Sequence, residues 1–388
     1  VFDTLSLRGV CGPVTINLLN TATNFNGNLV VSKITGSSIT NPILIKGRGN
    51  TVQSSVSPII RMNGVGHLTL DSLNVMGINN FAGFGIHLSN QCENVTIQNS
   101  TIEVGITSTL TTNAGIVASG LTTNATAAGN NVRNLKIINN RIIGGYYGII
   151  LNGEASYLNN FGHQILNNTI ERFYLYGIYT ANAENVLIDS NDIHRIGRPT
   201  FTTFYGYYGI TSRNIRLTKN RIHDAGVGSY TAYPITFSTS VNLAGQESQI
   251  INNAIYNVNT TGINYGIYLL TSTDGFRIYH NTINVDGGGT GAKRGVSFSI
   301  TPLNTEFRNN IIRVSGNASG TGAKHCIYVA TASPSFGSNN NVLYMGGIGG
   351  TINNVGFWGI ETPTLANWQS TSLKDSASSA RNPVFNDL

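Results

Sequence analysis

The stretch VLIDSNDIH at residues 186–194 and its near copy IRLTKNRIH at residues 215–223 decide the fold. Each begins with an apolar-x-apolar segment, continues through two or three polar residues rich in Asn, and ends in x-Ile-x. The same phrase returns as VTIQNSTIE from Val95, LKIINNRII from Leu135 and FRIYHNTIN from Phe276. A short phrase that recurs every few tens of residues is typical of repeat architectures. We therefore expect a solenoid.

Aligning the copies produces two columns of residues. Successive aliphatic residues that end the phrase lie between 23 residues (Ile170 to Ile193) and 40 residues (Ile102 to Ile142) apart. A second apolar segment, usually opened by Gly-Ile as at Gly148-Ile149, follows each copy, so that one period holds three short strands. The aliphatic column is Val75, Ile102, Ile142, Ile170, Ile193, Ile222, Ile255, Ile283, Ile312 and Leu343. The polar column two positions earlier is Ser100, Asn140, Asn168, Asn191, Asn220, Asn253, Asn281, Asn310 and Asn341.

Strands this short cannot bury a face on their own, but stacked coils join them into parallel sheets with continuous inward ladders. Neighbouring coils lie about 4.8 Å apart, so each residue meets its copy. An Asn column suits the bends, because Asn tolerates the left-handed conformation and its amide can bond its copies above and below. The sequence predicts an all-β, right-handed parallel β-helix of about ten or more coils.

We expect the whole chain, residues 1–388, to form one β-helix domain. Residues 1–65 form irregular first coils, residues 66–363 the regular coils, and residues 364–388 a C-terminal cap. A solenoid needs such a cap because its last coil would otherwise expose an unpaired edge. The apolar residues expected to cover that edge are Leu365, Trp368, Val384 and Phe385.

The composition agrees with this fold and limits the function. Of 388 residues, 45 are Gly and 51 are Asn, while only 10% are charged. The net charge of +6 is spread without a Lys/Arg run, so we predict no nucleic-acid partner and at most a weak preference for polyanions. No apolar stretch approaches the 18 residues of a membrane span. Three widely spaced Cys suggest neither a disulfide framework nor a zinc site. The chain begins at Val1 without a signal peptide, and we interpret it as a processed or excised piece.

Several segments resemble the right-handed β-helix repeat family of secreted and cell-surface proteins from Bacteroidetes-type bacteria. They are Gly12-Pro13-Val14-Thr15, Ile39-Thr40-Asn41-Pro42-Ile43, Leu68-Thr69-Leu70-Asp71-Ser72-Leu73, and Trp368 followed by Asn382-Pro383-Val384-Phe385. The resemblance implies a secreted or cell-surface location and a natural protein that continues past Leu388. It implies little about chemistry, because such families include enzymes, adhesive modules and proteins without known activity.

Enzymes of similar fold carry sequence signatures that this chain lacks. Polygalacturonase-like hydrolases use Asn-Thr-Asp, Asp-Asp, Gly-His-Gly and Arg-Ile-Lys, and none of these occurs here; the nearest phrase is Ser272-Thr273-Asp274. Pectate-lyase-like proteins need clustered Asp for calcium, and no such cluster is present. The family's catalytic residues therefore cannot be carried over.

One group of titratable residues flanks the aliphatic column on three successive coils: Glu171, Asp192, His194, Arg221 and His223. A carboxylate beside His would act as an acid/base pair, and a neighbouring Arg would neutralise a uronate. Two His and a carboxylate would also suit a metal, but we predict no metal and no cofactor. The alternative is structural: a cross-strand ion pair between Asp192 and Arg221, with the His residues belonging only to the repeat phrase.

Aromatic residues gather near the Gly-Ile strands, and rings with a polar edge make good platforms for sugars. Strict alternation from an inward Ile149 instead places Gly148 outward and Tyr147 inward, so the alternative is that some rings fill corners of the core. The candidate ligand-binding residues are Tyr147, Tyr176, Phe204, Tyr205, Tyr207 and Tyr208.

The sequence thus favours an extracellular or cell-surface β-helix module of a larger protein, acting as a stalk or adhesin that contacts a polysaccharide or cell-surface glycan. The alternative is a polysaccharide-active enzyme, specifically a lyase that acts on a uronate-containing polymer. Both hypotheses depend on like residues stacking from coil to coil.

Overall fold

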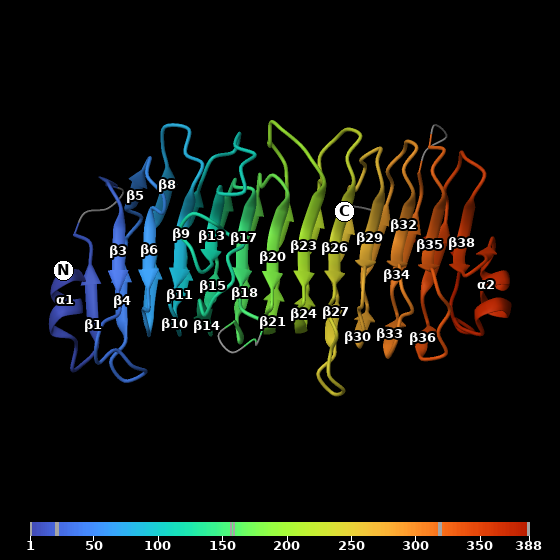
Figure 1. The fold of residues 1–388 in the computed structure, drawn as a ribbon. Coiled ribbons are helices and arrows are strands. Elements are labelled where there is room, and N and C mark those ends of the chain that lie inside the picture. Colours follow the sequence, from blue (N-terminus) through green and yellow to red (C-terminus); the bar gives the residue numbers. More distant parts are fainter. Residues whose placement is uncertain (1, 20–22, 156, 158–159, 317–319, 386–388) are drawn as a thin grey trace. The chain divides into compact units, whose positions relative to one another are not determined.

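The computed structural model describes residues 2–19, 23–155, 157, 160–316 and 320–385. The predicted domain ends, residue 1 and residues 386–388, lie outside the described residues. The chain divides into two compact units: unit 1 is Val1–Asp192 with Gly197–Thr200, and unit 2 is Ile193–Ile196 with Phe201–Leu388. In each unit, strands of one kind lie side by side (Figure 1). The chain is an all-β, right-handed parallel solenoid of about 12 turns, which confirms the predicted fold class.

Every coil contributes one strand to each of three parallel sheets, which we name A, B and C in chain order. In unit 1, sheet A contains β1 (Val14–Asn17), β4 (Ile43–Lys46), β7 (Leu68–Asp71), β11 (Thr96–Gln98), β15 (Lys136–Ile138), β18 (Gln164–Leu166) and β21 (Glu184–Asp189). Sheet B contains β2 (Asn24–Asn26), β5 (Thr51–Ser54), β8 (Asn74–Gly77), β12 (Thr101–Glu103), β16 (Arg141–Ile143) and β19 (Thr169–Glu171), and β22 (Asp192–His194) starts at the end of the unit. Sheet C contains β3 (Leu29–Ser32), β6 (Ile60–Asn63), β9 (Phe84–Ser89), β13 (Ala114–Ala118), β17 (Tyr147–Asn152) and β20 (Tyr176–Ala181). Helix α1 (Phe2–Arg8) precedes these strands, and the short pair β10 (Cys92–Glu93) and β14 (Val132–Arg133) forms a small fourth sheet.

Unit 2 repeats the same arrangement. Its sheet A contains β24 (Arg213–Thr218), β27 (Ser248–Ile251), β30 (Phe276–Tyr279), β33 (Thr305–Arg308) and β36 (Phe336–Asn339). Its sheet B contains β25 (Arg221–His223), β28 (Ala254–Tyr256), β31 (Thr282–Val285), β34 (Ile311–Val314) and β37 (Val342–Met345). Its sheet C contains β23 (Phe204–Ile210), β26 (Ala232–Ser238), β29 (Asn264–Leu269), β32 (Lys293–Phe298), β35 (Lys324–Val329) and β38 (Asn353–Trp358), and the short β39 (Glu361–Thr362) pairs with β38 in the antiparallel sense. Helix α2 (Leu365–Ser372) follows.

The predicted aliphatic column forms a buried ladder in sheet B of each unit. In unit 1, Ile102 pairs with Val75 and with Ile142 on the adjacent strands. In unit 2, Ile255 pairs with Ile222 and Ile283. The side chains of the column are at most 1% exposed. The repeat therefore places aliphatic residues of successive coils in contact with one another along the solenoid axis.

The predicted Asn column is also present, and it satisfies buried backbone groups. In unit 2, the backbone N–H and side-chain amide of Asn220 both donate to Asn253 Oδ1 at 3.0 Å, and the Asn253 amide donates to the Leu217 carbonyl at 2.9 Å. In unit 1, Asn140 donates to Asn168 in the same way.

The left-handed conformation expected of this column belongs to a different residue. It is adopted by the residue just before each Asn, as at Asn252 (φ 57°) and Lys219 (φ 55°). One residue therefore makes the turn, and the next makes the hydrogen bonds.

Glycine breaks the expected alternation in sheet C. A Cβ placed on Gly148 would lie 2.6 Å from Ile170 Cγ2, so this glycine faces the interior. Gly148 and the buried Ile149 thus both face inward, although they are successive residues. The strict alternation that placed Gly148 outward is therefore wrong here, whereas Tyr147 is buried.

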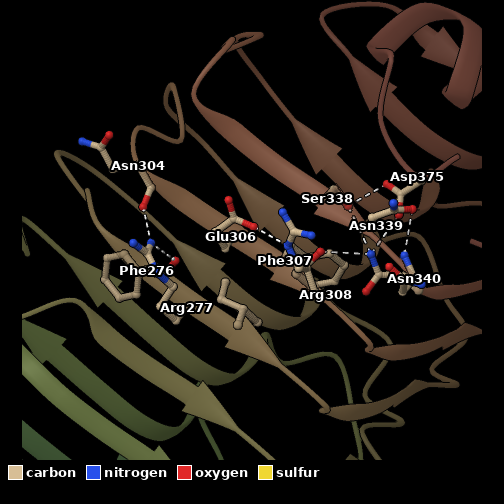
Figure 2. Close-up of polar contacts among 12 residues, drawn as sticks. Phe276, Arg277, Asn304, Glu306, Phe307, Arg308, Ser338, Asn339, Asn340 and Asp375 are labelled. Atoms are coloured by element: carbon tan, nitrogen blue, oxygen red, sulfur yellow. Dashed lines mark hydrogen bonds and ion pairs between the residues drawn. The ribbon is translucent and has the colours of Figure 1, made fainter. Parts of the chain in front are cut away.

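The C-terminal cap closes unit 2 with helix α2 and the segment after it. The predicted anchor Trp368 is fully buried, whereas Val384 is 78% exposed and covers nothing. The buried Asp375 carboxylate accepts a hydrogen bond from Ser338 Oγ at 2.6 Å (Figure 2). It also accepts hydrogen bonds from Trp368 Nε1 and from the Asn341 amide, each at 2.8 Å. Asn341 is the last Asn of the column, and no further Asn follows it to accept its amide. The Asp375 carboxylate takes the place of that acceptor.

Replacing a column Asn will destabilise the protein far more than replacing its neighbour. Asn253→Ala leaves the Asn220 amide and the Leu217 carbonyl without their partners, and each buried unpaired group costs about 1–3 kcal/mol. We expect urea unfolding to show a loss of at least that size. Asn252→Gly, at the exposed left-handed position, is the control and should be close to neutral. Equal losses for the two variants would contradict the ladder's role.

A buried histidine predicts loss of stability in acid. His163 Nδ1 accepts the Leu135 N–H at 3.2 Å and its Nε2 lies 2.9 Å from Asn160 Oδ1, an arrangement that needs the neutral ring. Burial lowers the pKa of His163 from 6.5 to about 3, so the unfolded chain binds the proton first. Stability present above pH 6.5 is lost as the pH falls toward 3, by about 2 kcal/mol at pH 5.

His163→Gln should flatten this pH dependence, measured by urea unfolding at pH 7 and pH 5. His280→Gln, at an exposed turn, is the control and should keep the parent slope. An unchanged slope in His163→Gln would show that another group accounts for the acid sensitivity, and His87, whose pKa is lowered by burial to about 4, would be the next variant to make.

Candidate functional site

The predicted titratable group is divided between the two units. In unit 1, the nearly buried Glu171 forms an ion pair with Arg141 at 2.5 Å across neighbouring strands of sheet B. Asp192 is half-buried at the start of β22. In unit 2, the exposed Arg221 stands opposite Ala254 on the next strand. Arg141, the ion-pair partner of Glu171, was not among the predicted residues.

The two histidines of the group do lie together, in unit 2. The rings of His194 and His223 stack with centroids 5.1 Å apart, and His223 stacks on Tyr256 at 4.7 Å. His194 Nδ1 accepts the Ile196 N–H at 3.3 Å, and His223 Nδ1 lies 2.5 Å from Asp224 Oδ2. Both rings are less than 10% exposed. The stack is thus a packed aromatic row with one carboxylate-supported imidazole.

The chemistry open to this row is acid/base chemistry at His223. A carboxylate on Nδ1 fixes the ring orientation and favours a proton on that nitrogen. Asp224, the partner that does this, was not among the predicted residues, although it follows His223 directly in the sequence. Within the described residues, no three His, Cys, Asp or Glu side chains are grouped so as to hold a metal ion.

The predicted aromatic residues of unit 1 form a compact cluster. Tyr147 and Tyr176 stack with centroids 5.2 Å apart and an interplanar angle of 6°, and Tyr179 meets both rings edge-on. Tyr147 is only 5% exposed because Ala125 and neighbouring apolar residues cover it. Tyr176 and Tyr179 are half-buried and form the accessible part of this cluster.

Two of the predicted ligand-binding residues in unit 2 lie in the interior. Tyr207 pairs with Ile235, and a Cβ on Gly206 would lie 2.5 Å from Ile222 Cγ2, so Gly206-Tyr207 occupies the Gly-Ile position of its coil. Gly209-Ile210, the Gly-Ile pair on which the repeat pattern aligns this coil, therefore lies three residues too late. Phe204 is also fully buried, with the Arg195 guanidinium 5.0 Å from its ring. Neither ring reaches the surface.

The neighbours of these buried rings begin a longer surface feature in unit 2, which we call the outer ladder. It consists of two columns on the outer face of sheet C, one opened by Tyr205 and the other by Tyr208. The first column is Tyr205, Tyr233, Tyr265, Arg294, His325 and Asn354, and the second is Tyr208, Thr236, Tyr268, Ser297, Tyr328 and Phe357.

Ring contacts run along the outer ladder from coil to coil. Tyr205, Tyr208, Tyr233, Tyr268 and Tyr328 are half-buried, so each ring packs on its neighbours and still reaches solvent. The centroid distances are 5.1 Å for Tyr205–Tyr208, 5.5 Å for Tyr205–Tyr233, 5.4 Å for Tyr233–Tyr265, 5.0 Å for Tyr233–Tyr268, 5.1 Å for Tyr265–Tyr268 and 4.5 Å for Tyr328–Phe357.

The phenols of the ladder are neutral hydrogen-bonding groups. Burial is the main cause that raises the pKa values of Tyr208, Tyr233 and Tyr265 above the usual value of 10. At neutral pH their hydroxyls therefore both donate and accept. The ladder offers apolar ring faces together with such hydroxyls, which is the combination that sugar rings need.

Charged groups occupy the half of the ladder that begins at Arg294 and runs toward helix α2. The Arg294 guanidinium lies 4.6 Å from the Tyr265 ring centroid and 3.3 Å from that of Tyr328. One coil on, His325 Nε2 lies 2.9 Å from Glu361 Oε2, which also accepts the Asn354 amide at 2.6 Å. Burial lowers the pKa of His325, while Glu361 opposes that shift.

Most of the outer ladder was missed from the sequence, although a signal was present. Tyr268 and Tyr328 both follow the Ile of the second phrase, as Gly266-Ile267-Tyr268 and Cys326-Ile327-Tyr328. Comparing the residue after that Ile across coils would have found the second column. His325 gives no such signal in the sequence, because Arg294, its neighbour in register, is of a different residue type.

Arginines also stand on the outer face of sheet A in unit 2, and two of them, Arg277 and Arg308, are paired with glutamate. Gln249 lies between Arg216 and Arg277 in register. Arg277 bonds Glu247 at 2.8 Å and the Asn304 carbonyl at 2.6 Å, and Arg308 forms an ion pair with Glu306 (Figure 2). This face of sheet A therefore differs from the outer ladder, where Arg294 is surrounded by rings.

Comparison with known proteins supports the fold. A family model described as a right handed beta helix region matches residues 130–283. No curated protein matches the chain. Among solved structures, a double mutant of the periplasmic alginate epimerase AlgG has 10% identity and a TM-score of 0.49, covering 95% of this chain and 84% of its own.

Two further solved structures are similar. PfbA, a surface adhesin of Streptococcus pneumoniae, has 16% identity and a TM-score of 0.47, with 79% of each chain covered. The A-module of an Azotobacter vinelandii mannuronan C-5 epimerase has 13% identity and a TM-score of 0.39, with 72% of this chain and 88% of the module covered. At such identities the likeness concerns the fold, and the function must be argued from the residues of this chain.

Proposed function

We propose that this chain is a non-catalytic β-helix module of a larger extracellular surface protein, a stalk or adhesin that binds polysaccharide along the outer ladder of unit 2. The observation that carries the proposal is the outer ladder itself: rings packed on one another from Tyr205 to Tyr265, then the Arg294 guanidinium, then the stacked pair Tyr328 and Phe357. A contiguous aromatic surface of this kind is typical of an interaction site. No helix in the described ranges is long and apolar enough to cross a membrane.

An extended glycan fits this surface better than a small ligand does. The rings recur at the coil spacing of about 4.8 Å, so a linear polymer can contact several of them at once. Each ring contributes a small free energy, about 0.5–1.5 kcal/mol for a packed aromatic pair, and a row of them adds up to useful affinity. The half-buried Tyr176 and Tyr179 offer unit 1 a smaller platform of the same kind.

Removing rings from the outer ladder should weaken glycan binding. We expect Tyr233→Ala and Tyr268→Ala each to weaken the affinity for a retained polysaccharide by about twofold to tenfold, because each loses one stacking surface. A polysaccharide panel identifies a retained polymer, and calorimetric titration then measures its affinity. Tyr279→Ala, on the outer face of sheet A in the same unit, is the matched control. Binding unaffected by both ladder variants would overturn the proposal.

A second candidate function, a lyase on a uronate-containing polysaccharide, is supported by one observation, the Asp224 carboxylate 2.5 Å from His223 Nδ1. If His223 removes a proton from the substrate, incubation with polygalacturonate or alginate will produce ultraviolet absorbance from the unsaturated product, and His223→Ala will abolish it. His280→Ala, at an exposed turn, serves as the control. No absorbance with the parent protein across a uronate panel would reject the lyase and leave the binding proposal standing.

A further inference from the structure

Arg294 is held in the middle of the outer ladder by two rings. Its guanidinium lies between Tyr265 and Tyr328, with the carbon atom Cζ 4.6 Å and 3.3 Å from the two ring centroids. A guanidinium stacked on aromatic faces is stabilised by cation–π attraction and keeps its N–H groups in the plane between the rings. The two rings therefore hold the Arg294 side chain in place in advance of any ligand.

The charge of Arg294 has no carboxylate partner within the described residues, which record no ion pair for it. Its Nη1 donates to Ser297 Oγ at 3.0 Å, and its Nε has no hydrogen-bond partner among those residues. The nearby Glu361 instead accepts from His325 and Asn354. Arg277 and Arg308 in the same unit, by contrast, both pair with Glu.

An unpaired cation within a surface that binds ligands points to an anion on the ligand. A planar guanidinium matches a carboxylate by two parallel hydrogen bonds, and charged hydrogen bonds are about twice as strong as neutral ones. Arg294 carries five N–H donors, of which Ser297 uses one. The remaining donors are sufficient for a bidentate contact.

We propose that the outer ladder selects an acidic polysaccharide and that Arg294 binds the carboxylate of one of its sugars, with sugars on either side stacked on the flanking rings. The inference rests on the proposed glycan binding and names its substrate class. Rings lie on both sides of Arg294 along the ladder, Tyr233 and Tyr268 on one and Phe357 on the other. A short uronate oligosaccharide should therefore bind much more tightly than the uronate monosaccharide.

The test compares one backbone with and without its carboxylates. We would titrate the intact chain with polygalacturonate and with polymannuronate, each beside its carboxyl-reduced neutral form, and with galacturonate as the monosaccharide. We expect at least one acidic polymer to bind about tenfold more tightly than its reduced form, and higher salt to weaken that binding. Arg294→Gln should lose this preference, and Arg294→Lys should recover part of it, because Lys keeps the charge without the fork.

Arg308→Gln is the matched control, since it removes an exposed arginine charge from the same unit outside the ladder. Equal binding of acidic and reduced polymers by the parent protein, which requires no variant to fold, would overturn the selection of acidic sugars and leave glycan binding intact. Binding of neither form, nor of any other glycan, would overturn the proposed function itself. A preference that survives Arg294→Gln but is lost in Arg308→Gln would assign the carboxylate site to sheet A.

Discussion

The structure depends on one recurring interaction, the hydrogen bonding of a buried Asn to its copy on the next coil. Asn253, for example, accepts two bonds from Asn220 on the preceding coil, and its amide donates back to the Leu217 carbonyl of that coil and forward to Asn281 on the next. A buried unpaired group costs about 1–3 kcal/mol, and this cost opposes a shift of register between the coils that the column joins. Where the column ends, Asp375 supplies the missing acceptor from the cap.

Fixed register in the bends has consequences on the outer surface. When coils cannot slip, every outward position is brought next to the same position on the neighbouring coil. Rings scattered through the sequence, such as Tyr208, Tyr268 and Tyr328, then fall into one column. The outer ladder requires no additional secondary structure, because the register of the core strands already places its side chains next to one another. For the same reason, a change in the Asn column would disturb a binding surface on another sheet.

The sequence predicted correctly the positions that are fixed by stacking on the same position of the next coil. It predicted wrongly the positions that depend on local backbone geometry within a strand. The pairing of Ile222 with Ile255 followed from the repeat, because aliphatic side chains at matched positions can only be buried together. Tyr207 was misplaced because the inward Gly206 lets two successive residues face the interior, which strict alternation does not allow. Tyr147 was misplaced because Ala125 and other apolar residues cover its ring. The ion pair of Glu171 with Arg141 was missed because the two residues stand on diagonal positions of neighbouring strands.

The sequence by itself determined that the chain winds into stacked coils, since periodic Ile and Asn have no other way to be buried and bonded. Only the tertiary structure decided which side chains meet on the surface. Arg294 and Tyr328 are 34 positions apart in the printed sequence, yet the cation lies 3.3 Å from the ring centroid. The loops between the repeated segments vary in length, and inward glycines change which face of the sheet the next residue occupies. Contacts of this kind therefore depend on the geometry of a whole coil, which no short sequence pattern contains.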